Sequence, residues 1–391
     1  MAIPNILFVH QSAEMYGSDK VLLYLVCGLQ PLGFHPIVLL PEDGPLMTAL
    51  KDTGVETYVV PVTKLDRKTL SLRGLAGLPW SLLKSVRSIS GVMQGRQIDL
   101  VYSNTLAVLG SAVWAKLRGI PHVWHVHEIL MSPGVVRRGF PWLLRLLADK
   151  IICNSNMTKD WLLGEQPSLA SKAVVIWNGQ GQRPAVSSAS AKAFRDSLGV
   201  GQDDLLVALV GRINRWKGQP LLVRSAALLW ERGVRHVHYV IVGGVAAGQE
   251  SLITELHGQI EASPASSHIH VTPFTHDVWS VWDACDIAVV PSTEPEPFGM
   301  VAIEAMASGK PVVVAAHGGL LDIVEHGVSG LLFQPNDAAK LADELQKLID
   351  NPSLRVQLGT VGCARQQSVF SLDGQLEASA NLFQSITGVG T

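Results

Sequence analysis

Short runs of apolar residues alternate with helix-length segments along almost the whole chain. Within most runs the apolar residues are consecutive, which indicates strands buried on both faces, as in parallel sheets covered by helices. The pattern therefore predicts an α/β fold. The predicted strands fall into two groups, at 5–10, 35–41, 56–61, 99–104, 121–127, 150–155 and 174–177, and at 205–211, 238–244, 269–274, 287–292, 311–315 and 330–333.

A break between the two groups lies near residues 178–204. Asn178-Gly179 is a turn signal, and residues 180–190 are polar, with neither strand nor helix periodicity. A length of 391 residues is too great for one ordinary core and agrees with two domains. We predict a Rossmann-like domain over 1–180, a linker and the start of the second domain over 181–204, a second Rossmann-like domain over 205–370, and a C-terminal helix over 371–391 that packs back on the first domain.

Composition narrows the class of protein. Apolar residues make up 47% of the chain and charged residues 16%, and the formal net charge is −2. These values argue against a disordered chain and against a dedicated nucleic-acid binder. The four cysteines lack metal-site or redox spacing, so we expect a reducing compartment. Because we find neither a signal-peptide pattern nor an apolar stretch of the about 20 residues that span a bilayer, we expect a cytoplasmic protein and consider peripheral contact with the inner face of the membrane.

The densest candidate cluster follows the predicted strand at 287–292, where the chain reads PSTEPEPFGMVAIE. Gly299 begins a predicted helix, whose free N–H groups can hold anionic or hydroxyl-bearing parts of a ligand. Glu296 lies at the tip of the loop and Glu304 about a turn into the helix, so both can contact one ligand of nucleotide-sugar length. A carboxylate on the helix suits ribose hydroxyls, and one at the tip could hold a sugar. The alternative is that these acids are solvated.

A second cluster, GRINRWKG at 211–218, follows the first strand of the second group. Arg212 and Lys217 suit a pyrophosphate, because Arg offers a planar fork of donors and Lys a point charge. Fixed cations of this kind can neutralise a leaving nucleoside diphosphate in place of a metal ion. The spacing is not that of a Walker loop. The competing interpretation is a cationic turn on the surface.

Taken together, these motifs resemble those of the family-4 retaining glycosyltransferases (glycosyl transferases group 1) of GT-B architecture. The resemblance rests on Gly-Arg-x4-Lys-Gly, Glu-x-Phe-Gly-x4-Glu and Ala-Met-Ala-Ser-Gly-Lys-Pro-Val-Val in this order, and it is strongest over 205–335. It implies two Rossmann-like parallel-sheet domains facing across a cleft. It also implies Arg212 and Lys217 on the donor pyrophosphate, Glu296 on the donor sugar and Glu304 on the ribose.

The resemblance has further implications for the site. Backbone groups of Phe298, Gly299 and Met300 would contact sugar hydroxyls and phosphate. The family pattern is metal-independent, so we expect no metal and no cofactor other than the donor substrate, a UDP- or GDP-linked sugar. The first domain would seat the acceptor.

Two residues of the first half match the family more loosely. The family places a histidine beside the donor sugar, and we assign that role to His127, at the end of the segment HVWHVHE. His125 lies on the same face of the strand and is expected to be a hydrogen-bonded wall residue. A His-x-His pair could instead bind a metal, but no third ligand is evident. Gly17, in the loop after the first strand, could bring the backbone near the phosphates or the acceptor, although Ser18 replaces the second glycine that the family usually carries.

Two basic segments of the first half raise the question of a membrane. Residues 64–96 carry seven basic side chains and one acid, and residues 137–147 combine arginines with Trp142 and leucines. Either segment could reach a lipid-linked acceptor at an anionic surface. The alternative is that the apolar residues form the core face of a Rossmann helix and the cations are solvated.

The function that these residues favour is transfer of a sugar from a nucleoside-diphosphate sugar to an acceptor hydroxyl. Retention of the anomeric configuration is what the resemblance to the family implies. The expected context is synthesis of a cell-surface polysaccharide, lipopolysaccharide or glycolipid, and the expected catalytic set is Glu296, His127, Arg212 and Lys217. Two alternatives remain: a nucleotide-sugar epimerase or hydrolase of the same architecture, and a non-enzymatic sugar-binding protein. A nicotinamide dehydrogenase is disfavoured because G-x-G-x-x-G follows the first strand of neither half.

Overall fold

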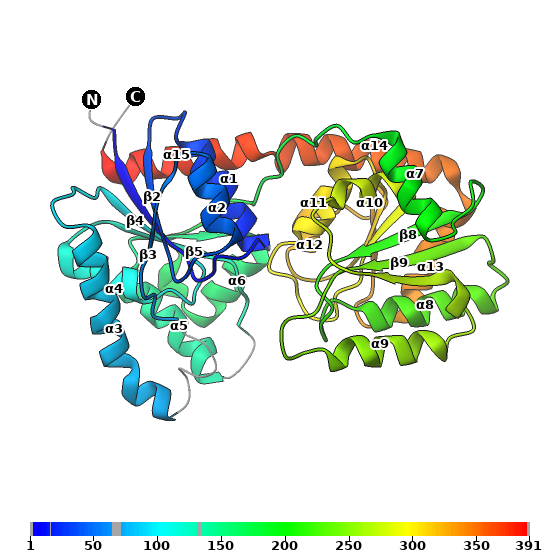
Figure 1. Ribbon diagram of the computed structural model, residues 1–391, viewed down its shortest axis with the longest axis horizontal. Coiled ribbons are helices and arrows are strands. Elements are labelled where there is room, and N and C mark those ends of the chain that lie inside the picture. The colour runs from blue at the N-terminus through cyan, green and yellow to red at the C-terminus, as the bar shows by residue number, and fades with distance from the viewer. Residues whose placement is uncertain (1–2, 16, 65–71, 131–133, 389–391) are drawn as a thin grey trace. The chain divides into compact units, whose positions relative to one another are not determined.

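The computed structural model describes residues 3–15, 17–64, 72–130 and 134–388 (Figure 1). The chain divides into two compact units. Unit 1 comprises the chain up to Gly179 together with the segment from Leu372 onward, and unit 2 runs from Gln180 to Ser371. Each unit holds one parallel sheet with helices against it, so the predicted fold class, two Rossmann-like α/β domains, is confirmed.

Unit 1 is built on a seven-stranded sheet with the order β3-β2-β1-β4-β5-β6-β7. All of its neighbouring strands pair in parallel. Its strands are β1 (Asn5–Val9), β2 (His35–Leu40), β3 (Glu56–Val59), β4 (Leu100–Asn104), β5 (His122–Val126), β6 (Lys150–Cys153) and β7 (Ala173–Val175). Its helices are α1 (Gly17–Leu29), α2 (Pro45–Asp52), α3 (Leu72–Val92), α4 (Gly110–Arg118), α5 (Gly134–Leu147), α6 (Asn156–Glu165), the short η1 (Pro167–Leu169) and α15 (Leu372–Thr387).

Unit 2 has a six-stranded parallel sheet with the order β10-β9-β8-β11-β12-β13. Its strands are β8 (Leu205–Val210), β9 (Val237–Val242), β10 (Ile269–Thr272), β11 (Ile287–Val290), β12 (Val312–Ala315) and β13 (Leu331–Phe333). Its helices are α7 (Ser188–Ser197), α8 (Gln219–Glu231), α9 (Ser251–Glu261), η2 (Ser266–His268), α10 (Val278–Ala284), α11 (Met300–Ala307), α12 (Leu320–Ile323), α13 (Ala338–Asp350) and α14 (Pro352–Val369).

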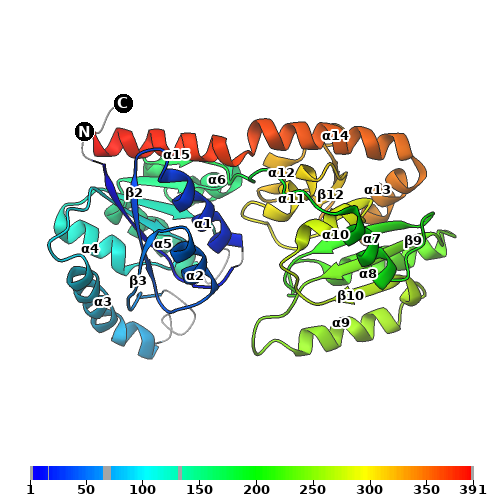
Figure 2. The same ribbon diagram turned by 45° about the horizontal axis from the view of Figure 1, so that its top comes forward.

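Each apolar run that was predicted to be a strand overlaps one, because such runs bury both faces of the sheet. In β1, Ile6 and Phe8 belong to a core cluster with side chains of α1, α2 and α15, whereas Leu7 and Val9 belong to another cluster with α3 and α4. Both views show α15 alongside α1 (Figure 1, Figure 2). Phe383 of α15 packs edge-on against Tyr102 of β4.

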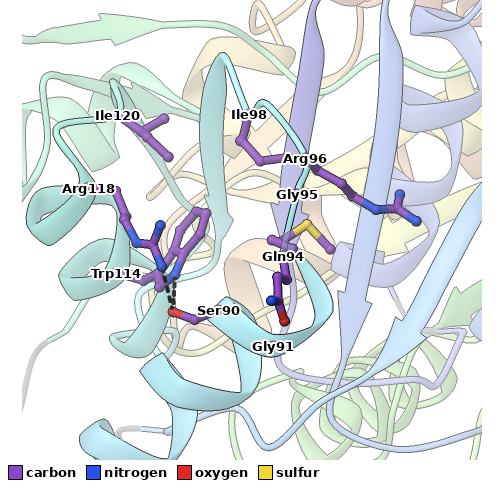
Figure 3. A pocket seen from close by; sticks show the side chains of 10 residues that line it. Ser90, Gly91, Gln94, Gly95, Arg96, Ile98, Trp114, Arg118 and Ile120 are labelled. Atoms are coloured by element: carbon purple, nitrogen blue, oxygen red, sulfur yellow. Dashed lines mark hydrogen bonds between the residues drawn. The ribbon is translucent and has the colours of Figure 1, made fainter.

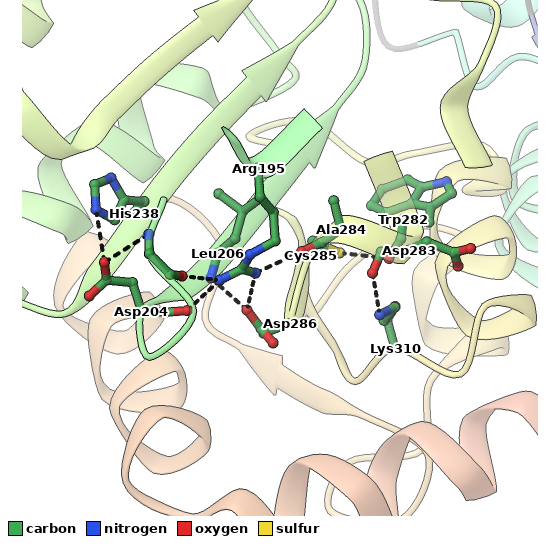
Figure 4. A network of polar contacts seen from close by, with 11 residues as sticks. Arg195, Asp204, Leu206, His238, Trp282, Asp283, Ala284, Cys285, Asp286 and Lys310 are labelled. Atoms are coloured by element: carbon green, nitrogen blue, oxygen red, sulfur yellow. Dashed lines mark hydrogen bonds and ion pairs between the residues drawn. The ribbon is translucent and has the colours of Figure 1, made fainter. Parts of the chain in front are cut away.

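Helix α7 lies in the stretch that was predicted to be a linker. It has no fully buried side chain, so the sequence shows no apolar stripe for it. The Arg195 guanidinium instead holds the helix to the sheet (Figure 4). It donates to the Asp286 carboxylate at 3.0 Å and to the carbonyl oxygens of Ala284, Gly201 and Asp204 at 2.9, 3.0 and 2.6 Å.

Candidate functional site

The Glu296 carboxylate, in the loop between β11 and α11, is buried and accepts two side-chain hydrogen bonds. The residue is only 4% exposed. Its Oε1 accepts hydrogen bonds from the Lys217 ammonium at 2.5 Å and from the Ser292 hydroxyl at 2.6 Å. These two hydrogen bonds replace the water that the carboxylate loses on burial. The structure therefore brings together Glu296 and Lys217, which the sequence singled out in separate motifs.

The loop after β8 carries Lys217 to this position through contacts of its backbone. The Asn214 side chain accepts from the N–H groups of Trp216 and Lys217 at 3.1 and 2.9 Å, forming a tight turn. Gly218 then has φ of 80°, and a Cβ there would lie 1.9 Å from the carbonyl oxygen of Pro291. Only glycine permits both this conformation and this approach. The loops after the neighbouring strands β8 and β11 are thus in close backbone contact.

A third loop, after β12, supports the peptide of Glu296. The N–H of Gly319 donates to the Glu296 carbonyl at 2.7 Å. Gly318 has φ of 65°, and a Cβ there would lie 2.3 Å from the same carbonyl oxygen. His317 Nε2 lies 2.8 Å from the carbonyl oxygen of Ser292 and must donate to it, since a carbonyl only accepts. Burial lowers the pKa of His317, which keeps the ring neutral at neutral pH.

The other residues predicted in this half lie on the same two loops and on α11. Arg212 is exposed on the loop after β8, two residues beyond the strand. Phe298 is buried, and Gly299 precedes Met300, the first residue of α11. Glu304 is half-buried in the second turn of that helix. All of these positions follow the carboxyl ends of β8 and β11, where open α/β sheets bind ligands.

In unit 1, polar side chains gather where the adjacent strands β1, β4 and β5 end. His10 directly follows β1, Asn104 ends β4 and His127 directly follows β5. All three are buried. His127 Nε2 lies 2.8 Å from Asn104 Oδ1, Asn104 Nδ2 lies 3.0 Å from His10 Nδ1, and His10 Nε2 lies 2.6 Å from the Asp19 carboxylate. A chain of hydrogen bonds therefore runs from Asp19 to His127.

The ring of His125 lies against that of His127, with the ring centroids 3.8 Å apart and the ring planes tilted by 42°. His125 Nδ1 is hydrogen-bonded to the Tyr102 hydroxyl. Among the described residues, no group of three or more His, Cys, Asp or Glu side chains has an arrangement that could hold a metal ion.

Burial sets the charge of the ionisable groups along β5. It lowers the pKa of His122 to about 4 and that of His125 to about 3. Burial, with smaller contributions from His125 and His10, also lowers the pKa of His127 well below its ordinary value. The opposite holds for Glu128, because burial of its carboxyl raises the pKa to about 7. At neutral pH the three rings are uncharged, and Glu128 is about half protonated.

These shifts predict a pH dependence of stability in which Glu128 opposes the histidines. Below pH 6.5 His122 and His125 bind protons in the unfolded state but remain neutral in the folded state. The free energy of unfolding therefore decreases as the pH is lowered. Folded Glu128 binds its proton more tightly than the unfolded chain does, so its contribution rises as pH falls from 7 toward 4.5. Between pH 7 and pH 5, His122, His125 and Glu128 each change the free energy of unfolding by roughly 2 kcal/mol.

The variant Glu128→Gln removes the opposing contribution and can still accept the N–H groups of Leu106 and His127 that the native carboxylate accepts. Its melting temperature should fall further than that of the native protein between pH 7 and pH 5, by roughly 4–8 °C more. Thermal unfolding followed by circular dichroism at the two pH values measures this difference. An equal fall in both proteins would contradict the assignment.

Gly17 begins α1, and a Cβ at this position would meet nothing within 4 Å. Crowding by the surrounding chain therefore does not require glycine there, and its predicted role next to a ligand stays a prediction. Tyr16 of the same loop lies outside the described residues.

One pocket of unit 1 lies at the wrong edge of the sheet for this site (Figure 3). Its lining includes Arg96 and Ile98, just before β4, and Ile120, just before β5. Trp114 Nε1 donates to the Ser90 hydroxyl across it at 2.9 Å. Because ligands of open α/β sheets bind at the carboxyl ends of the strands, we do not place the active site here.

Several supporting residues were not predicted as site residues. They are His10, Asp19, Asn104, Ser292 and His317. His10, Asn104 and Ser292 end predicted strand runs, so the rule that ligands bind at strand ends could have found them. Asp19 and His317 carry no such signal, because only the folded chain buries them beside a partner.

Comparison with known proteins identifies relatives over most of the chain. The model of the family described as Glycosyltransferase Family 4 matches residues 15–179, and that described as Glycosyl transferases group 1 matches residues 190–363. A curated relative, the D-inositol 3-phosphate glycosyltransferase of Corynebacterium aurimucosum, is 37% identical over 59% of this chain and 56% of its own length. That of Actinosynnema mirum is 35% identical over 56% of this chain and 54% of its own length. The matches thus span little more than half of these two relatives.

Solved structures resemble the chain over nearly its full length. The structure of Anabaena Alr3699/HepE in complex with UDP and glucose has a TM-score of 0.84 and 27% identity, covering 97% of this chain and 99% of that one. A glycosyltransferase from Rickettsia africae has a TM-score of 0.85 at 19% identity, covering 99% of both chains, and shows likeness of fold alone.

Proposed function

Because the chain belongs to the family-4 glycosyltransferases of GT-B fold, we propose that it transfers a sugar from a nucleoside-diphosphate sugar to an acceptor hydroxyl, with retention of the anomeric configuration. The observation that carries the proposal is the ion pair between the partly buried Lys217 and the buried Glu296, at the carboxyl ends of β8 and β11. The Lys217 ammonium also lies 4.4 Å from the centroid of the Trp216 ring, which adds a cation–π attraction. Its position is thereby fixed before a ligand binds.

Fixed cations at this point suit a departing nucleoside diphosphate. In the proposed reaction, Lys217 and Arg212 stabilise the charge that develops on the leaving phosphate, and Glu304 holds the ribose. N–H groups at the start of α11, near Phe298, Gly299 and Met300, contribute further donors. The solved complexes of Anabaena HepE with UDP and with UDP-glucose support a donor of this class.

On the sugar side, Glu296 and His127 would hold the sugar while the acceptor oxygen forms its bond to the anomeric carbon. The bond from that carbon to the phosphate oxygen breaks, and the oxygen keeps the electron pair. The acceptor proton passes to the leaving phosphate, on the same face of the sugar, so that configuration is retained. The side chains supply orientation and charge stabilisation, which together can account for several kcal/mol of barrier lowering.

The acceptor class has two candidates. The sequence motifs favour a growing cell-surface polysaccharide, lipopolysaccharide or glycolipid. The names of the curated relatives instead suggest an inositol phosphate. Both are tested by incubating the protein with UDP- and GDP-linked sugars and each acceptor, in parallel reactions with and without EDTA.

We expect the sugar to appear on one acceptor and EDTA to leave turnover unchanged, because the cations of the site are side chains. Release of free sugar alone would indicate a hydrolase, and conversion of the donor sugar to its epimer would indicate an epimerase. Loss of turnover in EDTA, with recovery on addition of manganese or magnesium, would show that the ionic part of the proposal is wrong.

We also propose that unit 1 meets an anionic membrane through the layer formed by α3, α4 and α5, whose inner sides pack on one face of the sheet. Their sequences contain eight Lys and Arg and no Asp or Glu. Trp80, Leu117 and Trp142 are 74%, 71% and 53% exposed on these helices. Part of the predicted basic segment, residues 65–71, lies outside the described residues. None of the described helices is both long and apolar enough to cross a bilayer.

Each basic side chain near an anionic surface contributes about 1 kcal/mol, so a few of them can hold a protein there reversibly. We expect the protein to sediment with vesicles that contain phosphatidylglycerol, but not with neutral vesicles, and to be released by salt. Arg138→Glu with Arg145→Glu should abolish this binding. Lys51→Glu, an exposed charge reversal on α2 at the other face of the sheet, should not. Equal loss in both variants, or no sedimentation of the native protein, would favour a soluble acceptor.

A further inference from the structure

The hydrogen-bond chain of unit 1 has only one consistent arrangement of protons when both of its histidines are neutral. The Asp19 carboxylate can only accept, so His10 carries its proton on Nε2. His10 Nδ1 then has a lone pair and accepts from the Asn104 amide. The amide nitrogen of Asn104 therefore faces His10, and its oxygen faces His127.

A second contact supports this orientation of the amide. Asn104 Nδ2 also lies 3.5 Å from the carbonyl oxygen of Ser18, which only accepts. If the amide were reversed, its oxygen would face both this carbonyl and the His10 lone pair. The contacts of Asn104 Nδ2 with His10 Nδ1 and with the Ser18 carbonyl both require the nitrogen on that side. The amide oxygen, Oδ1, then accepts from His127 Nε2.

Burial of the four residues makes the arrangement rigid. His10 is 0% exposed, Asn104 1%, Asp19 2% and His127 9%. They come from β1, the first turn of α1, and the ends of β4 and β5, which are adjacent elements. In a buried site an unmatched donor or acceptor costs about 1–3 kcal/mol, which strongly disfavours the other tautomers.

We propose that Asp19, His10 and Asn104 are positioning residues that hold His127 as the neutral tautomer protonated on Nε2, so that its Nδ1 serves as a hydrogen-bond acceptor for a hydroxyl of the donor sugar. The inference rests on the proposed function for the contact between His127 and the sugar. The tautomer itself follows from the contacts of unit 1 with both rings neutral, and it needs no ligand. A neutral acceptor at this point discriminates in favour of a hydroxyl donor, whereas a ring protonated on Nδ1 would present a competing N–H.

The tautomer can be measured without any substrate, by two-bond 1H–15N correlation spectra of the full chain labelled with 15N-histidine. The variant His127→Gln identifies the signals of His127 by their absence. In the native protein we expect Nε2 to be protonated and Nδ1 to have the shift of an unprotonated ring nitrogen. In Asn104→Ala, His127 should lose this preference and populate both tautomers. Asn104→Asp should restore Nε2 protonation in part, because one carboxylate oxygen can still accept from His127 while the other faces the His10 ring and the Ser18 carbonyl without a proton to donate.

We expect kcat to decrease in the variants that disturb the His127 tautomer. We expect kcat to fall roughly tenfold to a hundredfold in Asn104→Ala, less in Asp19→Asn, and to recover in part in Asn104→Asp, with KM for the donor changing by less than about threefold. Ser103→Ala is the matched control, since Ser103 is buried beside Asn104 in β4 but bonds to Ser111 and His122 instead. It should leave the His127 tautomer unchanged and kcat within about twofold.

The possible results distinguish the positioning of the His127 tautomer from the contact between His127 and the sugar. A native His127 protonated on Nδ1, or a tautomer that Asn104→Ala and Asp19→Asn leave unchanged, would overturn the positioning role even if His127→Gln abolished turnover. If the tautomer responds as expected but kcat does not, the positioning role in the reaction is overturned and the proposed contact between His127 and the sugar falls with it.

Discussion

Replacing Lys217 with alanine is expected to lower kcat by about a hundredfold or more, equivalent to about 2.7 kcal/mol of barrier. The ammonium is held 2.5 Å from the Glu296 carboxylate, and we propose that from this position it stabilises the leaving diphosphate. Glu296→Ala should lower kcat by a similar factor, because Glu296 is proposed to stabilise positive charge that develops on the sugar. Steady-state kinetics at saturating donor, with the purified variants, measure both effects.

The same substitutions also break an ion pair whose Glu296 side chain is 5% exposed and whose Lys217 side chain is 19% exposed, so stability must be separated from catalysis. Removing one partner of such a pair leaves the other uncompensated and can cost about 3–5 kcal/mol, whereas removing both is far less harmful. The double variant Lys217→Ala with Glu296→Ala should therefore regain much of the stability but none of the turnover. Recovery of turnover in the double variant would show that the pair is structural only. Lys192→Ala, which breaks an exposed ion pair with Asp196, should change kcat less than twofold.

Gly318→Ala is expected to destabilise unit 2 by more than about 3 kcal/mol and to lower kcat at least tenfold. The added methyl would lie 2.3 Å from the carbonyl oxygen of Glu296 and 2.6 Å from its nitrogen. Since both are backbone atoms, the peptide that carries the Glu296 carboxylate has to move. A shift of about 1 Å is enough to cost a hundredfold in rate.

Gly309→Ala provides a matched control for the backbone conformation. Gly309 has φ of 68°, against 65° for Gly318, but a Cβ at 309 meets nothing within 4 Å. It should therefore lose only the roughly 1–2 kcal/mol of a left-handed alanine, with kcat unchanged. Urea unfolding and steady-state kinetics of the two variants give the comparison. Similar losses in both would show that the approach of Gly318 to Glu296 has no importance for the site.

Most of the fold could be predicted because its strands are continuous apolar runs, and the same pattern located Lys217 and Glu296 at strand ends. The ion pair between them could not be predicted, because the two residues are 79 positions apart and meet only through the loop contacts of Gly218 and Ser292. Helix α7 was missed for a different physical reason. Hydrogen bonds of Arg195 hold it in place, and these leave no periodicity in the sequence.

The site of unit 1 was predicted only in part. His127 was named from a family resemblance and His125 from strand alternation, but the chain of contacts behind them was not. An aspartate in the first turn of a helix ordinarily serves to cap it or to complement the helix dipole. Asp19 instead lies buried against His10, and nothing in the sequence distinguishes the two situations.

We propose above all that the loops after β8 and β11 hold the diphosphate of a nucleotide sugar. The most direct test is calorimetric titration of the native protein and Lys217→Ala with the tightest-binding nucleoside diphosphate and the matching monophosphate. We predict that the native protein binds the diphosphate at least tenfold more tightly than the monophosphate, and that Lys217→Ala loses most of this preference. An unchanged preference in Lys217→Ala, or no binding of any nucleoside diphosphate by the native protein, would contradict the claim.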